Sequence, residues 1–156
     1  MPRLTALLHT HNDVLRLGRC LETVYPCDDL LIVDHHSHDA TVRVAQAYGA
    51  KVIQGGSDSL IDYEKLASGW LLCLRPCESL TEGLAASLYE WKAQSAPGNS
   101  TISLYVRKET SNGWIDHPHP QTRLVPANWR HWHNHLPIHD PSAHTLEGAL
   151  FRFAFP

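Results

Sequence analysis

The chain has 156 residues, of which 43% are apolar and 19% are charged, values typical of one folded globular domain. Its formal net charge of −3 gives no electrostatic reason to expect a nucleic-acid partner. No stretch approaches the roughly 20 apolar residues of a membrane span, and the apolar residues 4–8 are too few for the core of a signal peptide. We therefore expect a cytoplasmic protein without a transmembrane segment.

The first third of the chain alternates apolar strands with amphipathic helices. Residues 4–8 predict a first strand, and Asn12 or Asp13 is placed to cap the helix that follows. Residues 30–33 predict a strand buried on both faces, and residues 39–48, which end before Gly49, predict a second helix. Residues 51–53 predict a third strand. Short connections in this β-α-β-α-β order favour a parallel sheet with right-handed crossovers.

The remaining elements are less regular. Residues 60–67 predict a short helix, residues 70–74 a fourth and central strand, and Thr81 or Ser79 is placed to cap a further helix. Residues 96–100 predict a linker, residues 101–107 a strand, and residues 146–155 a last strand, whereas residues 109–142 show no period and are expected to be irregular. We expect strand order 3-2-1-4 in a mostly parallel sheet, within a three-layer α/β/α sandwich.

A polar turn follows the buried second strand directly. Asp34 ends the apolar run, and Asp39 stands at the start of the next helix, where its carboxylate can accept bonds from free backbone N–H groups. Open α/β sheets bind their ligands at the carboxyl ends of the strands. Asp34 is therefore the leading candidate for a ligand-facing residue, against the alternative of a carboxylate that simply faces solvent.

Four runs of the first 55 residues resemble the family-2 glycosyltransferases, which adopt the GT-A fold, a Rossmann-related α/β architecture. The small bacterial branch related to lipopolysaccharide-core sugar transferases is the most similar. The matching runs are Thr10-His11-Asn12-Asp13, Arg19-Cys20-Leu21-Glu22-Thr23-Val24, Val33-Asp34-His35-His36-Ser37-His38-Asp39-Ala40-Thr41 and Tyr48-Gly49-Ala50-Lys51-Val52. Each run alone is a weak signal, and their order along the chain makes the combination specific.

The resemblance implies sugar transfer, with inversion, from a nucleotide-diphosphate donor to a glycan or lipid-linked acceptor. It implies one domain over residues 1–156, with a nucleotide-binding part at 1–95 and an irregular acceptor-side part at 96–156. Thr10 and Asn12 would line the nucleotide pocket, and Asp34 would accept a hydrogen bond from the base or ribose. Mg²⁺ or Mn²⁺ would be the family's cofactor.

The chain departs from the family after the fourth strand. The family carries Asp-Ala-Asp-Glu there, with aspartates that hold the metal, and this chain has Arg75-Pro76-Cys77-Glu78. Because hard divalent cations need carboxylates, no metal ligand is predicted, and Arg75 and Glu78 are the candidates for the diphosphate side. Arg75 either binds the diphosphate in the place of the metal or is a surface arginine left after loss of the metal site. The alternative function is accordingly a degenerate, non-catalytic homologue that acts as a nucleotide-binding or assembly module.

The chain holds 12 histidines, and alternate ones at His131, His133 and His135, with His139, offer imidazoles for Zn²⁺. A histidine-rich metal-binding protein is thus a third hypothesis, against solvated loop histidines. Cys73 and Cys77 form only an isolated pair, so free thiols are expected. Residue types alone leave the catalytic base open among Asp116, Asp140 and the histidines.

Overall fold

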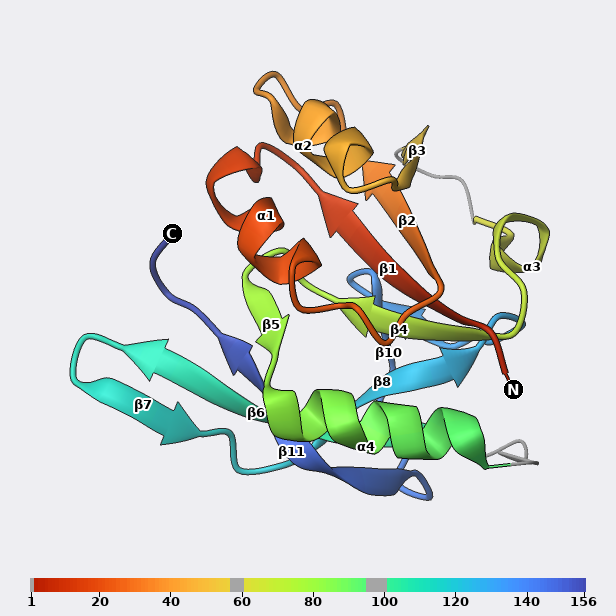
Figure 1. Cartoon of the computed structure of the whole chain (residues 1–156), viewed down its shortest axis with the longest axis vertical. Coiled ribbons are helices and arrows are strands. Elements are labelled where there is room, and N and C mark those ends of the chain that lie inside the picture. The colour runs from red at the N-terminus through yellow and green to blue at the C-terminus, as the bar shows by residue number, and fades with distance from the viewer. Residues whose placement is uncertain (1, 57–60, 95–100) are drawn as a thin grey trace.

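The computed structural model describes residues 2–56, 61–94 and 101–156. Figure 1 shows their path from the N-terminus to the C-terminus. The predicted linker at 96–100 lies outside the described residues, as does residue 60 of the short helix predicted at 60–67. The elements are β1 (Leu4–Thr10), α1 (Val14–Leu21), β2 (Asp29–Asp34), α2 (Thr41–Ala47), β3 (Lys51–Gln54), α3 (Tyr63–Leu66), β4 (Trp70–Leu74), β5 (Glu78–Leu80), α4 (Glu82–Ala93), β6 (Ile102–Thr110), β7 (Gly113–Asp116), β8 (Gln121–Pro126), β9 (Trp132–His133), β10 (Leu136–Pro137) and β11 (His144–Arg152).

One curled, mixed sheet organises the described residues. Its strands follow the order β3-β2-β1-β4-β8-β6-β11-β5, with β7 paired to β6. The first four strands are parallel and have the predicted order 3-2-1-4. Beyond β4 the sheet is no longer mostly parallel, since β8 runs antiparallel to both β4 and β6. The prediction of a mostly parallel sheet therefore holds only for its first half.

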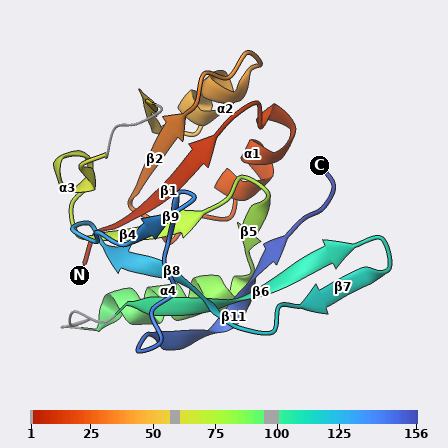
Figure 2. The same cartoon turned by 180° about the vertical axis from the view of Figure 1, so that it is seen from behind.

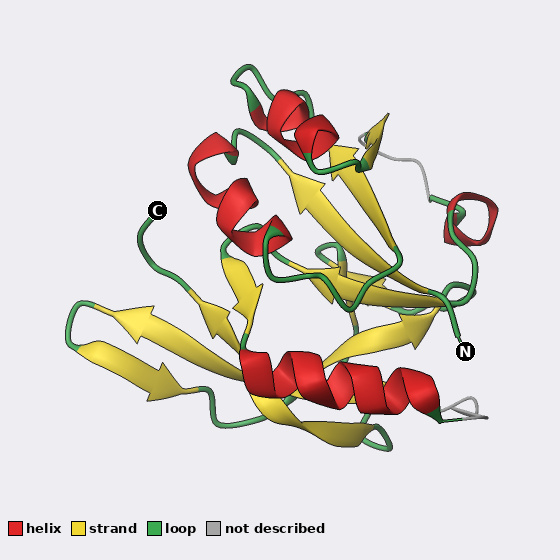
Figure 3. Ribbon diagram, in the orientation of Figure 1, coloured by secondary structure: helices red, strands yellow, loops and turns green. Residues whose placement is uncertain are grey.

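The two faces of the sheet are covered differently. Alternate β1 residues Leu4, Ala6 and Leu8 pack in one core cluster with residues of α1 and α4, on the side where Figure 3 shows the long helix α4. The opposite face packs Leu7 with Tyr63 of α3 and with aromatic residues near β9. Figure 2 shows β9 on this second side. A short helix and a hairpin thus stand where the predicted three-layer sandwich has a helical layer.

The prediction of irregular structure at 109–142 was wrong. These residues include β7, β8 and the β9–β10 hairpin, and β8 is a buried strand between β4 and β6. Arg123 is one of the four buried residues 122–125 of β8, of which only Leu124 and Val125 are apolar, so the continuous apolar run that identifies a buried strand is lacking. Glu78 has the same effect on the three-residue strand β5. Both elements were missed because a charged residue belongs to a buried segment, as the first residue in β5 and within the strand in β8.

The helix ends match the predictions in part. The hydroxyl of Thr81 accepts a 3.3 Å hydrogen bond from the Leu84 N–H and caps α4 as predicted. Asp13 precedes α1 without a side-chain capping bond, since its carboxylate accepts the His11 N–H instead. Asp39 accepts the Thr41 N–H at the start of α2. No helix among the described residues is long and apolar enough to cross a membrane.

We expect Gly148→Ala to destabilise the fold by more than about 2 kcal/mol, because a left-handed backbone disfavours a side chain and β11 approaches α4 closely there. Gly148 has φ +91°, and an added methyl group would collide with the backbone at Leu84. Gly113→Ala is the matched control, since Gly113 has φ +112° with open space around it. Urea unfolding measures both variants. Equal losses would show that the close approach to α4 contributes nothing.

Candidate functional site

The loops after β1 and β2 lie side by side and are joined by hydrogen bonds. The His35 N–H donates to the Thr10 carbonyl at 2.8 Å. The Asn12 N–H donates to the Ser37 hydroxyl at 2.8 Å, and the His38 N–H donates to the Asn12 side-chain oxygen at 2.8 Å. The two strand ends are therefore neighbours, as the sequence predicts, and their polar groups connect the two loops to each other.

Asp34 lies beneath these loops with no exposed surface. Its Oδ1 accepts the hydroxyls of Thr10 at 2.8 Å and Ser37 at 2.6 Å, and its Oδ2 accepts the Ser37 N–H at 2.9 Å and the Gln54 amide at 3.5 Å. Burial alone would raise the pKa of Asp34, but these donors outweigh it and lower that pKa. A direct contact between Asp34 and a nucleoside stays a prediction, and it would require Ser37 or Gln54 to withdraw.

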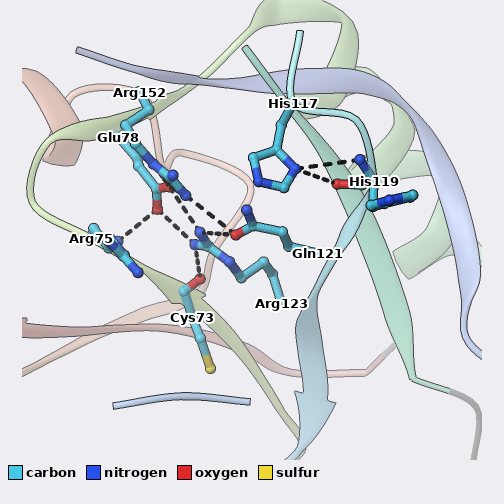
Figure 4. A network of polar contacts seen from close by, with 8 residues as sticks. All are labelled: Cys73, Arg75, Glu78, His117, His119, Gln121, Arg123 and Arg152. Atoms are coloured by element: carbon cyan, nitrogen blue, oxygen red, sulfur yellow. Dashed lines mark hydrogen bonds and ion pairs between the residues drawn. The ribbon is translucent and has the colours of Figure 1, made fainter. Parts of the chain in front are cut away.

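Glu78 lies at the centre of a buried ion-pair network (Figure 4). Two guanidinium nitrogens of Arg123 donate to its two carboxylate oxygens at 2.6 and 2.8 Å, and Arg152 donates at 3.0 Å. Burial by itself would raise the pKa of Glu78, yet the charge and hydrogen bonds of Arg123, together with the Arg75 N–H and Arg152, hold it below its usual value. The carboxylate is fully engaged within the protein.

The residues after β4 therefore do not fit the divalent metal that the family resemblance implies. Glu78 is the one acidic residue of the Arg75-Pro76-Cys77-Glu78 turn, and its carboxylate oxygens face Arg123 and Arg152 rather than a ligand. Mg²⁺ and Mn²⁺ require oxygen ligands, and the neighbouring Arg75 is positively charged. The predicted donor-side role of Glu78 stays a prediction, for which this geometry offers no free oxygen.

Arg75 is exposed and lies beside a pocket at the carboxyl ends of β1 and β4. The pocket measures about 270 Å³, and its lining includes His9, Asp13, Arg16 and Arg75. Arg75 contacts Glu78 through its backbone: its N–H donates to the Glu78 carboxylate at 2.8 Å, and its carbonyl accepts the Glu78 N–H at 2.9 Å. The Nε of Arg16 is buried without a hydrogen-bond partner among the described residues. Two arginines thus line one pocket.

This position is the switch point of the sheet, where the strand order turns from β1 toward β4 and where α/β folds bind ligands. A second hollow of about 420 Å³ adjoins the first and shares Arg75, Asn134 and Leu136 with it. A larger hollow of about 540 Å³ lies at the opposite, amino ends of β1 and β2, beside Arg3 and Asp29. The two adjoining hollows form the candidate site.

Three histidines meet at the edge of this pocket, a feature that the sequence reading missed. His9 from β1, His35 after β2 and His135 from the β9–β10 turn each place one ring nitrogen within 4.8 Å of the other two. Burial and the two neighbouring imidazoles lower the pKa of His9 to about 3, so this ring is neutral at pH 7. Of the four histidines predicted to act together, His135 belongs to this group, whereas His131, His133 and His139 do not.

We expect Arg123→Met to destabilise the chain by about 3–5 kcal/mol, because it leaves the Glu78 carboxylate buried beside a single remaining arginine. Arg107→Met is the control, since the exposed Arg107–Asp116 pair lies on the β6–β7 hairpin and exposed pairs contribute little. Chemical denaturation at pH 7 measures both variants. A small loss for Arg123→Met would show that Arg152 alone compensates the charge of Glu78.

Acid should destabilise the protein through Asp34 and Glu78. A carboxyl whose pKa is lowered by folding contributes its full stability above its unfolded-state pKa, ordinarily 3.8 for Asp34 and 4.5 for Glu78, and loses that contribution as the pH falls toward the folded-state value. Unfolding free energies measured from pH 7 to pH 3 should therefore decline below about pH 4.5. Asp34→Asn should lower stability at pH 7 by about 1–3 kcal/mol and make the acid decline shallower. Asp116→Asn, on the exposed hairpin, should keep the wild-type profile.

No model of a known protein family matches the chain, and no curated protein sequence matches it. Solved structures, in contrast, do match the chain. The Staphylococcus aureus protein TarS superposes with a TM-score of 0.51 at 16% identity, over 80% of this chain and 28% of that chain. Glucosyl-3-phosphoglycerate synthase from Mycobacterium tuberculosis, in complex with Mn²⁺, uridine diphosphate and phosphoglyceric acid, superposes with a TM-score of 0.51 at 15% identity.

The second match covers 71% of this chain and 45% of that chain, so the chain spans less than half the length of either structure. At sequence identities this low, the similarity shows a shared arrangement of the backbone and does not show a shared activity. The four parallel strands in the order 3-2-1-4, continued by antiparallel strands, agree with that arrangement. The chain therefore has the mixed α/β fold of the GT-A glycosyltransferases.

Proposed function

We propose that the chain binds a nucleotide-diphosphate sugar and transfers the sugar to a glycan or lipid-linked acceptor. The observation that carries this proposal is the pocket at the ends of β1 and β4, where Arg16 and Arg75 face one hollow. Guanidinium groups bind phosphate oxygens through charged, often bidentate hydrogen bonds. The diphosphate of a donor supplies such oxygens at the place where this fold binds ligands.

The departing diphosphate carries the negative charge that develops during sugar transfer. Arg75 is exposed between the two adjoining hollows, so its guanidinium can contact a diphosphate in one while the acceptor enters the other. Arginines placed in this way stabilise the leaving group electrostatically. Asp34 and Thr10 then act on the nucleoside side by fixing the two loops that border the pocket.

A non-catalytic nucleotide-binding module is the second candidate. The observation that favours it is that Asp34 and Glu78, both predicted at the donor site, are buried and hydrogen-bonded within the protein. A chain that kept the fold and the arginines would bind nucleotides without transferring sugar. The two candidates share the same binding site and differ only in turnover.

We expect Arg75→Ala to weaken binding of uridine, guanosine or cytidine diphosphate by about 10- to 100-fold, because it removes a charged hydrogen bond to phosphate. Isothermal titration calorimetry without added metal measures the affinity. Arg107→Ala removes an equal charge from the β6–β7 hairpin and should leave the affinity unchanged. Absence of binding by all three nucleotides would contradict both candidates.

Turnover separates the two candidates. Incubation with UDP-, GDP- and CDP-sugars, followed by measurement of released nucleoside diphosphate, should show donor hydrolysis or transfer if the chain is an enzyme. Nucleotide binding without release would favour the binding module. The same release by Arg75→Ala as by the wild-type chain would place the diphosphate elsewhere.

A further inference from the structure

We propose that His9, His35 and His135 form a binding site for a transition-metal ion, with Zn²⁺ as the expected occupant. The three residues come from β1, the loop after β2 and the turn between β9 and β10, so the folded chain alone brings them together. The proposal is independent of nucleotide binding, since the metal alone tests it.

The spacing of the imidazoles suits a shared ion after a small adjustment. His9 Nδ1 and His35 Nε2 are 2.8 Å apart, and one nitrogen of each of the three rings lies within 4.8 Å of the others. Tetrahedral Zn²⁺ with bonds of about 2.0–2.1 Å places its ligand nitrogens about 3.3 Å apart. The first pair must therefore open slightly and His135 must approach.

His135 is the ring that has room to move. It stacks on His9, with ring centroids 4.0 Å apart and planes inclined by 13°, and it lies at the exposed tip of a hairpin. Parallel rings direct their in-plane lone pairs side by side rather than toward a common point. Rotation of the exposed His135 side chain turns its nitrogen toward the other two.

A neighbouring hydroxyl determines which nitrogen of His9 can bind the ion. His9 Nε2 lies 3.0 Å from the hydroxyl oxygen of Tyr63, which belongs to α3. If Nε2–H donates to this oxygen, Nδ1 keeps its lone pair and faces His35. A hydrogen bond to the second ring nitrogen is the usual way in which proteins orient a histidine ligand.

The backbone around the cluster is held in unusual conformations. The four described non-glycine residues with positive φ all lie in the three loops that carry or border these histidines: Asn12, His36, Asn134 and His135. Asn134 and His135, with φ 48° and 66°, form the two-residue connection of a hairpin, where a type I′ turn favours Asn-Gly. A histidine in the glycine position costs conformational energy, and such strain is concentrated at functional sites.

The position of His35 depends on Gly55. A methyl group at Gly55 would collide with the His35 ring, so the absence of a side chain there lets the imidazole approach β3 closely. Gly55 itself is fixed by donation of its N–H to the Asp34 carbonyl at 2.8 Å. The ring therefore lies in a space that this glycine leaves open.

The ligand set selects the class of metal. Three neutral imidazoles without a carboxylate suit Zn²⁺ and its neighbours Co²⁺, Ni²⁺ and Cu²⁺, rather than Mg²⁺ or Mn²⁺. Three protein ligands leave a fourth position of the tetrahedron open, as in sites where the ion contacts water or a substrate. His9 and His135 also line the pocket that contains Arg16 and Arg75, so the ion would lie in the wall of that pocket.

His135→Gly is the decisive variant, because it removes a ligand and gives the turn the Asn-Gly sequence that its backbone prefers. In the absence of metal, this variant should be at least as stable as the wild-type chain. Calorimetric titration with Zn²⁺ should show one site in the wild-type chain and an affinity more than about 100-fold lower in the variant, since even loss of a supporting hydrogen bond costs about 10- to 100-fold. His133→Ala, exposed on the same hairpin, should bind as the wild-type chain does.

Two further measurements complete the test. Co²⁺ should give the intense visible absorption of a four- or five-coordinate site, and His135→Gly should abolish it. Tyr63→Phe should weaken Zn²⁺ binding by about 10- to 100-fold through loss of the bond to His9. Equal Zn²⁺ affinity of wild-type and His135→Gly chains, or an equal loss in His133→Ala, would overturn the proposal and indicate binding by surface histidines.

Discussion

The bidentate pair between Glu78 and Arg123 joins the two halves of the sheet. Glu78 belongs to β5 at one end of the strand order, whereas Arg123 belongs to β8 in the middle, and Arg123 also donates to the Cys73 carbonyl of β4 at 3.1 Å. Arg152 of β11 completes the charge balance at 3.0 Å. A carboxylate without exposed surface persists only where such partners surround it. The curl of the sheet brings them together.

This arrangement makes the candidate site differ from the one that the sequence predicts. The acidic residues expected to face a donor are used to build the scaffold: Asp34 joins the loops after β1 and β2, and Glu78 holds the turn after β4. With that turn fixed, Arg75 stays exposed and lines the pocket together with Arg16. Among the residues that line this pocket are therefore cations and imidazoles together with one acidic residue, Asp13.

The sequence was informative where structure depends on nearby residues. Strands β1 to β4 follow from apolar runs separated by helical periods and short connections, and their order is the one expected together with the fold that the family resemblance implies. Strands β5 and β8 were not predicted, because the buried charges of Glu78 and Arg123 are stabilised by each other across 45 positions of the chain. The histidine cluster was missed for the same reason. His135 is brought to His9 by a hairpin, and no periodic pattern in the nearby sequence predicts that hairpin. Contacts distant in sequence leave no periodic pattern.

The chemistry of the pocket follows from the turn after β4, where this chain has Arg75-Pro76-Cys77-Glu78 instead of the aspartates of the family that it resembles. Carboxylates at the end of β4 would attract hard cations and repel a bare diphosphate, whereas Arg75 and Arg16 favour the diphosphate directly. Imidazoles at the same edge do not compete for this role, because neutral nitrogen donors prefer softer ions than Mg²⁺. A pocket can therefore hold guanidinium groups for phosphate and an imidazole cluster for a transition metal side by side. In this chain the two sets meet at His9 and His135, which belong to the histidine cluster and also line the pocket.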